Sequence, residues 1–316
     1  MKRKETGKWW EILTGVIILA IFVGLLVCKP PIIHREIPSN STEKADKSLE
    51  VLAFIPYWIK SVKVPSRVDY IALFALIPEK GGWRPLIKAP RKVGRNTKLL
   101  WTLKIHSEDE KEWLESDQTM VDMVEGLEPY MKNSDGVVIN MEDWTKYLKL
   151  EKLVSAIKER YPHKLLMVTL PSWGLPVSGN LGSMVDRFIV MAYDYNYKGG
   201  VLAPLPAVEN TIRFYKPIAS KTLLGIPLYG YLRGNGSISA IQINTLESGT
   251  RSHTDEGEAI SHYKVGTVIW NDKHTIKMKM DLARKYGIRG IALWALGYSS
   301  QDFIESIIDM AKKGGK

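Results

Sequence analysis

Short apolar runs recur along the chain from residue 51 onward, with segments of helical periodicity between several of them. The runs are rich in Val, Ile and Leu and do not alternate strictly with polar residues, which is typical of parallel strands buried on both faces. Eight such runs predict strands at Val51–Ile55, Tyr70–Leu76, Lys98–Leu103, Gly136–Glu142, Leu165–Leu170, Arg187–Met191, Thr222–Ile226 and Gly290–Trp294. Apolar residues at helical spacing predict helices over Leu150–Tyr161 and Asp272–Tyr286.

This order of elements predicts one α/β domain over residues 49–316, a (β/α)8 or TIM barrel. A closed barrel routinely reaches this length as a single domain. The composition is 45% apolar, which allows a sizeable core. The segment from Gly234 to Val265 contains a glycine-containing turn and a charged stretch. We expect this segment to form an insertion after the seventh strand, in the form of a mobile flap.

The first 48 residues follow a different pattern. Residues 1–8 are basic, residues 9–28 carry Glu11 as their only charge, and residues 29–48 are polar and contain proline. Twenty helical residues span roughly 30 Å, the thickness of the hydrocarbon core of a bilayer. The sequence therefore predicts a cytoplasmic tail, a transmembrane anchor and a linker, with the barrel outside the cytoplasm by the positive-inside rule. A cleaved signal peptide and a lipid-modified Cys28 are the alternatives.

The charge and the cysteine content of the chain limit the kinds of partner and cofactor that we expect. The net charge is +10, of which +8 belongs to residues 51–316. Lys and Arg do not form a block interleaved with aromatic residues, which argues against nucleic-acid binding. An anionic cell-surface polymer fits the charge better, although a lysine-rich solvated surface explains it without a ligand. The single cysteine excludes an intrachain disulfide and a cysteine-based metal site, and we expect no metal or other cofactor.

The predicted fourth strand carries the most informative polar side chains. Side chains alternate across a strand, so Val138, Asn140 and Glu142 share one face while Val137 and Ile139 share the other. Asn140 and Glu142 then lie roughly 7 Å apart along the strand and point into the barrel. An amide and a carboxylate at this spacing can hold a substrate between them. A buried strand that ends in a solvated turn is the simpler alternative.

Aromatic residues and acids gather at the predicted carboxyl ends of the strands, where the active sites of TIM barrels lie. Besides Glu142, these positions hold Tyr57, Trp58, Trp144, Trp173, Tyr193, Asp194, Tyr195, Tyr229 and Trp294. A pyranose ring offers an apolar face of C–H groups and an equator of hydroxyls, so it suits aromatic faces beside polar groups. One such aromatic residue is more often part of a core, but six strand ends together indicate a glycan-binding cleft.

Four motifs, in order, resemble those of family 18 glycoside hydrolases, the chitinase-like barrels, over nearly all of residues 50–312. The fourth strand is similar to the family signature D-G-x-D-x-D-x-E, with Asp135, Gly136 and Glu142 in place. The motifs of strands six, seven and eight resemble Met191–Asp194, Leu224–Gly230 and Gly290–Gly297. A weaker similarity over residues 268–297 points to the branch that contains spore-cortex-lytic N-acetylglucosaminidases.

The resemblance implies substrate-assisted, retaining hydrolysis of a β-1,4-linked N-acetylglucosaminide without an enzyme nucleophile. It implies that Glu142 protonates the glycosidic oxygen and then activates water. In the same scheme Asn140 holds the acetamido N–H, while Tyr193 and Asp194 bind and support the acetamido carbonyl. Trp294 stacks beneath the reacting sugar. The other aromatic residues at the strand ends are expected to bind the substrate.

Two positions depart from the family signature, because Val138 and Asn140 stand where the family has aspartates. An amide oxygen can accept from the acetamido N–H but offers no negative charge to the cationic intermediate. We expect a membrane-anchored, extracytoplasmic hydrolase of carbohydrate metabolism that binds chitin-like glycans. A chitinase-like lectin that binds such glycans without cleaving them is the alternative. Chitin, peptidoglycan, an N-linked chain and a surface polysaccharide all stay open as the glycan.

Overall fold

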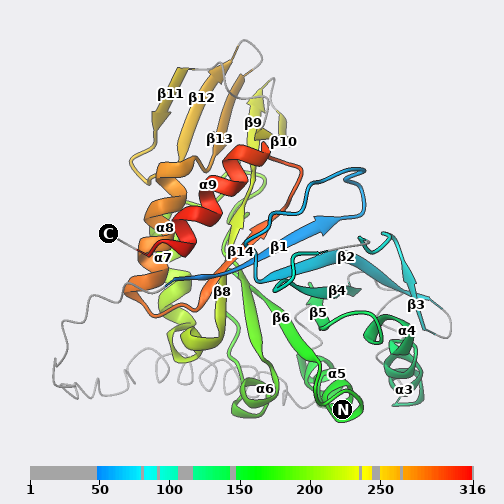
Figure 1. The fold of residues 1–316 in the computed structure, drawn as a ribbon. Helices are drawn as coiled ribbons and strands as arrows, with labels where there is room; N and C mark the ends of the chain where they lie inside the picture. Colours follow the sequence, from blue (N-terminus) through cyan, green and yellow to red (C-terminus); the bar gives the residue numbers. More distant parts are fainter. Residues whose placement is uncertain are drawn as a thin grey trace, which may run out of the picture. The chain divides into compact units, whose positions relative to one another are not determined.

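Eight parallel strands close into a barrel in the computed structural model, which describes residues 48–79, 82–90, 93–105, 117–142, 147–234, 237–243, 250–263 and 266–314. The barrel strands are β1 (Glu50–Pro56), β2 (Tyr70–Glu79), β4 (Lys98–Ile105), β5 (Gly136–Met141), β6 (Leu165–Pro171), β7 (Arg187–Met191), β8 (Thr222–Pro227) and β14 (Gly290–Trp294). They pair in chain order, and β14 returns to pair with β1, which closes the ring (Figure 1). All eight predicted strands are confirmed, with ends shifted by at most three residues.

Helices cover the outside of the barrel (Figure 1). They are α3 (Asp117–Glu125), α4 (Glu128–Met131), α5 (Tyr147–Arg160), α6 (Gly179–Met184), α7 (Leu205–Phe214), the 3-10 helix η3 (Lys216–Lys221), α8 (Lys273–Lys285) and α9 (Gln301–Lys312). Both predicted helices are present as α5 and α8. The side chain of Asp272 accepts the N–H of Thr275 at 2.8 Å, so α8 begins with a capping residue of the preferred type.

The strand residues divide into two apolar layers by alternation. On β5, Val137, Ile139 and Met141 belong to the outer core beneath the helices, whereas Val138 belongs to a smaller cluster inside the barrel. The predicted two faces of this strand are therefore confirmed. Residues of the inner cluster fill the barrel from within, as is usual for this fold. A pocket opens at the carboxyl ends of the strands.

Aspartates tie the amino ends of neighbouring strands together. Each stands just before a strand, and its carboxylate accepts the N–H of the second residue of the preceding barrel strand. The pairs are Asp69 with Val51 at 2.6 Å, Asp135 with Leu99 at 2.7 Å and Asp186 with Leu166 at 2.8 Å. A Cβ atom on Gly136 would lie 2.0 Å from the carbonyl oxygen of Leu165, so only glycine fits there. The Asp-Gly start of the fourth-strand motif therefore serves barrel closure.

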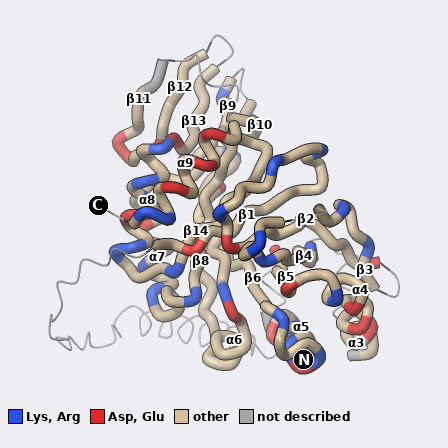
Figure 2. The backbone as a smooth tube through the Cα atoms, viewed as in Figure 1, with Lys and Arg blue, Asp and Glu red and all other residues tan. Residues whose placement is uncertain are grey.

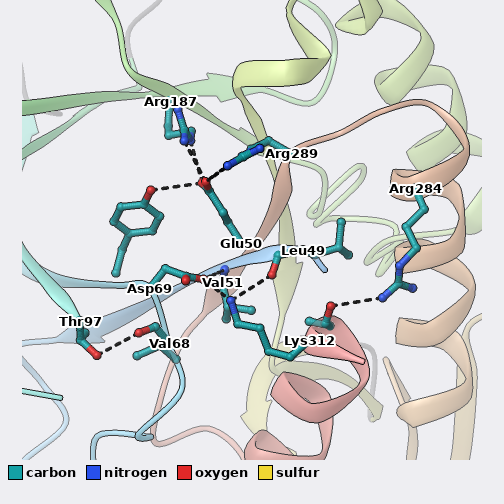
Figure 3. A network of polar contacts seen from close by, with 12 residues as sticks. Leu49, Glu50, Val51, Val68, Asp69, Thr97, Arg187, Arg284, Arg289 and Lys312 are labelled. Carbon is teal, nitrogen blue, oxygen red and sulfur yellow. Dashed lines mark hydrogen bonds and ion pairs between the residues drawn. The ribbon is translucent and has the colours of Figure 1, made fainter. Parts of the chain in front are cut away.

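Glu50 forms the centre of a polar network at the same end of the barrel (Figure 3). Its carboxylate accepts from Arg187 Nε at 2.7 Å, from Arg289 Nε at 2.7 Å and from the Tyr70 hydroxyl at 3.2 Å. Burial alone would raise the pKa of this carboxyl, but the hydrogen bonds and charges of the two arginines outweigh burial and lower its pKa to about 2. Glu50 thus joins β1, β2, β7 and the residue before β14 by charge as well as by backbone pairing.

The insertion after the seventh barrel strand is a five-stranded antiparallel sheet, not the flap that the sequence suggested. Its strands are β9 (Tyr229–Gly234), β10 (Ser237–Gln242), β11 (Thr250–His253), β12 (Ala259–Tyr263) and β13 (Gly266–Trp270), in the order β10-β9-β13-β12-β11. The sheet begins five residues earlier and ends five residues later than predicted, because β9 follows β8 almost without interruption. Its strands project beside α8 and α9 in Figure 1.

None of the described helices combines the length and apolar character needed to cross a bilayer. The predicted tail, anchor and linker, residues 1–48, lie almost wholly outside the described residues.

Candidate active site

A pocket of about 460 Å³ opens at the carboxyl ends of the barrel strands. Its lining side chains come from the barrel strands and from the first residues of the loops that follow these strands. Its lining residues are Phe54, Phe74, Asn140, Glu142, Thr169, Pro171, Ser172, Trp173, Ile189, Met191, Tyr193, Asp194 and Trp294. Six of the residues predicted for the site from sequence are therefore brought together in one cavity.

Asn140 and Glu142 contact each other in this pocket. Asn140 is 5% exposed near the end of β5, and its Nδ2 donates to Glu142 Oε1 at 3.2 Å. Glu142 follows the last residue of β5 and is exposed to the pocket opening. Val138 lies one step deeper, in the apolar cluster inside the barrel. The inward side chains of β5 therefore become more exposed from Val138 through Asn140 to Glu142, and the Glu142 carboxylate lies where a ligand can reach it.

Trp294 is held by edge-to-face contacts with its aromatic neighbours. Its ring centroid lies 5.2 Å from that of Phe54 and 5.0 Å from that of Phe74. Trp58 contacts Trp294 from a third side at 6.2 Å, and its indole N–H donates to the Tyr298 hydroxyl at 2.9 Å. Such contacts fix the orientation of an aromatic ring. The indole is therefore a preorganised flat surface, as stacking of a sugar requires.

Asp194 is held by two tyrosine hydroxyls. Its backbone is left-handed, with φ of 57°, a conformation that Asp tolerates better than most residues. Its carboxylate accepts short hydrogen bonds from Tyr229 and Tyr231. Removal from water by the surrounding protein raises the pKa of the Asp194 carboxyl; the two hydroxyls oppose that rise, and the charge of Glu142 adds to it. The same surroundings raise the pKa of the Tyr193 hydroxyl far above its usual value, so Tyr193 is a hydrogen-bond donor at neutral pH.

The insertion sheet supplies the residues that hold this part of the pocket. Tyr229, Tyr231 and Arg233 alternate along β9 and share one face. Arg233 Nη2 donates to the carbonyl oxygens of Gly199 and Gly200, at 2.9 and 2.7 Å, in the loop after β7. The first strand of the insertion therefore fixes both the acid and the loop that follow β7.

Two tyrosines predicted to bind substrate face elsewhere. The Tyr195 hydroxyl lies 2.7 Å from Thr211 Oγ1 on α7, because the left-handed residue before it turns the chain out of the strand direction. Tyr229 is 5% exposed and contacts Asp194 instead of lining the pocket. Neither tyrosine is among the described lining residues of the pocket, and direct substrate contact by them stays a prediction.

The predicted residues after the first strand lie at the edge of the pocket. Trp58 packs against the pocket wall, while Tyr57 is 42% exposed and lines a second groove. Asp135 is at the opposite end of β5, so the first acid of the motif is structural. Trp144 lies outside the described residues.

Sequence analysis did not identify Phe54, Phe74, Tyr231 and Tyr298 as site residues. The two phenylalanines occupy inward positions of β1 and β2, and the strand alternation could have indicated them. Tyr231 stands two residues after Tyr229 on the same strand face, a signal that depends on knowing that a strand continues there.

The charge in the pocket is negative. The described lining residues include the carboxylates of Glu142 and Asp194 and neither lysine nor arginine. The described part of the chain also holds no cluster of three or more His, Cys, Asp or Glu side chains suited to a metal ion. The arrangement can donate a proton from a carboxyl group, donate hydrogen bonds to a carbonyl, and stabilise positive charge beside a flat aromatic surface.

Comparisons with known proteins agree with this geometry. The family model for glycosyl hydrolases family 18 matches residues 118–302, more than half of the chain. The uncharacterized glycosylase YvbX of Bacillus subtilis (strain 168) is 28% identical over 217 residues, which cover 59% of this chain and 62% of YvbX. The match thus spans less than two thirds of that relative.

Solved structures share the fold. The spore cortex-lytic enzyme SleL of Bacillus cereus aligns over 84% of this chain and 74% of its own, with a TM-score of 0.67 and 17% identity. The chitinase RmChi1 of Rhizomucor miehei aligns over 83% of this chain and all of its own, with a TM-score of 0.68 and 17% identity.

Proposed function

Because the chain belongs to glycosyl hydrolases family 18, we propose that its barrel hydrolyses β-1,4-linked glycans that contain N-acetylglucosamine. The observation that carries this proposal is the contact of Asn140 with Glu142 in a pocket of about 460 Å³ that Trp294 also lines. A cavity of this volume accommodates a sugar ring with its substituents. The names of the similar proteins, a spore cortex-lytic enzyme and a chitinase, support the same substrate class.

The proposed mechanism is retaining and assisted by the substrate. Glu142 donates its proton to the glycosidic oxygen while the acetamido carbonyl oxygen attacks the anomeric carbon and the bond to the leaving sugar breaks. Tyr193 donates to the acetamido carbonyl, and Asn140 accepts the acetamido N–H. Water then attacks the anomeric carbon from the vacated side, and Glu142 takes its proton. The released sugar keeps the β configuration at its anomeric carbon.

Charge in the pocket supports the intermediate of this scheme. The ring formed by acetamido attack is cationic, and Asp194 and the ionised Glu142 are the acids of the pocket. Asn140 contributes a dipole where the family signature has a carboxylate. One preorganised electrostatic group is commonly worth about 10²–10³ in rate, so we expect a slower enzyme than the signature with both aspartates would give.

A lectin without hydrolytic activity is the second candidate, favoured by Val138 and Asn140 at the two aspartate positions. One experiment distinguishes the enzyme from the lectin. Purified full-length protein is incubated with chitin oligomers, peptidoglycan fragments, N-linked glycans and surface polysaccharide, and the released products are identified by mass spectrometry. Hydrolysis of at least one of these glycans supports the enzyme, whereas binding without any product supports the lectin.

The membrane location is proposed from the sequence. Residues 9–28 carry a single charge and follow a basic segment, which favours an uncleaved anchor with the barrel outside the cytoplasm. In intact cells an external protease should then digest the barrel, while the mature protein keeps residues 1–28. A mature chain that starts at or after residue 28, or a barrel protected from the protease, contradicts this topology.

A further inference from the structure

A second groove, of about 410 Å³, lies back to back with the catalytic pocket across β1 and β2. On these strands Phe54 and Phe74 face the catalytic pocket, whereas their neighbours Ile55 and Leu73 line the groove. The remaining lining residues come from the loops after β1 and β3: Tyr57, Ile59, Lys60, Ser61, Val62, Val64, Leu86, Ile87, Lys88 and Pro90. The two cavities are therefore separated by the thickness of one strand layer.

The groove exists because the chain between β1 and β2, residues 57–69, forms no helix. From β4 onward, helices lie between successive barrel strands and cover their outer faces (Figure 1). Over the start of the barrel a short loop takes the place of a helix and leaves a concave surface. This surface is open to a ligand from solvent.

The chain segment that supplies most of the groove lining is strongly basic. Residues 57–98 contain ten Lys and Arg against two Asp and Glu, a net charge of +8 that equals the net charge of all residues 51–316. Blue positions mark the loop after β1 in Figure 2. Lys60 and Lys88 are exposed and form no hydrogen bond or ion pair with any described residue, and no described lining residue is acidic. The lysines are thus available to an anion.

We propose that this groove binds a carboxylate group carried by the same glycan that enters the catalytic pocket. The proposal rests on the proposed function and specifies its substrate as an acidic glycan. Lys60 and Lys88 supply the charge, and the hydroxyls of Tyr57 and Ser61 supply further donors. An aromatic path joins the two sites, because Trp58 contacts Tyr57 at 4.8 Å and Trp294 at 6.2 Å between ring centroids. A glycan strand that crosses this path brings its acidic substituents to the lysines.

The test measures binding by full-length Glu142→Gln protein to two oligosaccharides of equal length. One is a neutral N-acetylglucosamine oligomer, and the other carries carboxylate substituents on alternate sugars. Lys60→Gln/Lys88→Gln is compared with Lys216→Gln/Lys273→Gln, a control that removes two exposed lysines elsewhere on the barrel that form no hydrogen bond or ion pair with any residue that the structure describes. We expect the first pair to weaken binding of the acidic glycan about tenfold at low salt, with the loss shrinking at high salt, and to leave the neutral glycan unchanged.

Three results overturn the proposal. One is equal affinity of the parent protein for acidic and neutral glycans, and another is an equal loss in the control pair. A third is that free polyphosphate binds through Lys60 and Lys88 while glycan affinity stays the same, which assigns the groove to a separate polyanion. Failure of the proposed function is distinguishable, because it appears as the absence of product when the native protein is incubated with either glycan, whereas the present proposal is judged by the binding of the Glu142→Gln protein.

Discussion

Acidic residues at the two ends of the barrel have pKa values shifted in opposite directions. At the amino end, Glu50 lies between Arg187 and Arg289, and its pKa falls to about 2. At the carboxyl end, Asp194 is held by tyrosine hydroxyls in a pocket whose described lining has no cation, and its pKa rises. The same strands therefore end in a neutralised ion network on one side and in uncompensated negative charge on the other.

This difference indicates that the acids at the amino end contribute to stability and the acids at the carboxyl end to catalysis. Paired acids at the amino end stay ionised and hold strands that are distant in sequence, such as β1 and β7. Acids without cationic partners keep an affinity for protons and stabilise positive charge, as a catalytic site requires. Substitution of Glu50 should therefore change stability with little effect on turnover, and substitution of Glu142 should change turnover with little effect on stability.

The largest effect is expected for Glu142→Gln. The amide keeps the shape but cannot donate and recover a proton, so kcat should fall by about 10²–10⁴. Unfolding in denaturant should be nearly unchanged, because Glu142 is exposed. Glu159→Gln, at an exposed position of α5, is the matched control and should leave both quantities unchanged. Turnover by Glu142→Gln at the rate of the control would remove Glu142 from its role.

Glu50→Gln should give the opposite result. With a pKa of about 2 in the folded state and about 4.3 unfolded, the ionised carboxyl contributes roughly 3 kcal/mol of stability near neutral pH. This contribution is lost as pH falls from above 4.3 through about 2, so the stabilities of the two proteins should converge in acid. Urea titrations between pH 7 and pH 2 measure it. A constant difference across that range would disprove the charge-based role.

Asp194→Asn should show the reverse pH dependence. Because the folded state holds the Asp194 proton more tightly than the unfolded chain does, the native protein should lose stability relative to the variant as pH rises from about 4 through the raised pKa. Asn tolerates the left-handed backbone and can accept from both tyrosines. Urea titrations over the same pH range measure the difference in stability between the native protein and the variant. If this difference changed with pH in the same direction as it does for Glu50→Gln, the contrast between the two ends would be contradicted.

The smallest effect is expected for Tyr231→Phe. It removes one of the two hydroxyls on Asp194 and should cost about 1 kcal/mol of stability, with a fall in kcat of less than tenfold. Tyr263→Phe, on the distant strand β12 of the same sheet, is the control. A loss of kcat without any change in KM would indicate that the insertion acts by positioning the acid. An unchanged kcat would show that Tyr229 suffices.

The sequence predicted the barrel well because its strands are apolar and regularly spaced. The inward face of β5, with Asn140 and Glu142 on it, followed from alternation alone. The hydrogen bond between these two side chains did not, because alternation predicts a spacing along the strand and not the side-chain conformations that bring the amide and the carboxylate together. Alternation fails where the chain changes direction, which is why Tyr195 was assigned to the pocket although the left-handed Asp194 turns it away. The insertion sheet was missed because β10 and β11 are rich in polar residues and carry no apolar period. Its pairing is decided by contacts between distant strands.

The anomeric configuration of the first released sugar tests the proposed chemistry most directly. Full-length protein is mixed with a chitin hexamer in an NMR tube, and the anomeric proton signals are recorded before mutarotation. Substrate-assisted hydrolysis by Glu142 predicts that the β anomer appears first, and that Glu142→Gln gives no product. An α anomer as the first product, or release by the Glu142→Gln protein at the native rate, would contradict it.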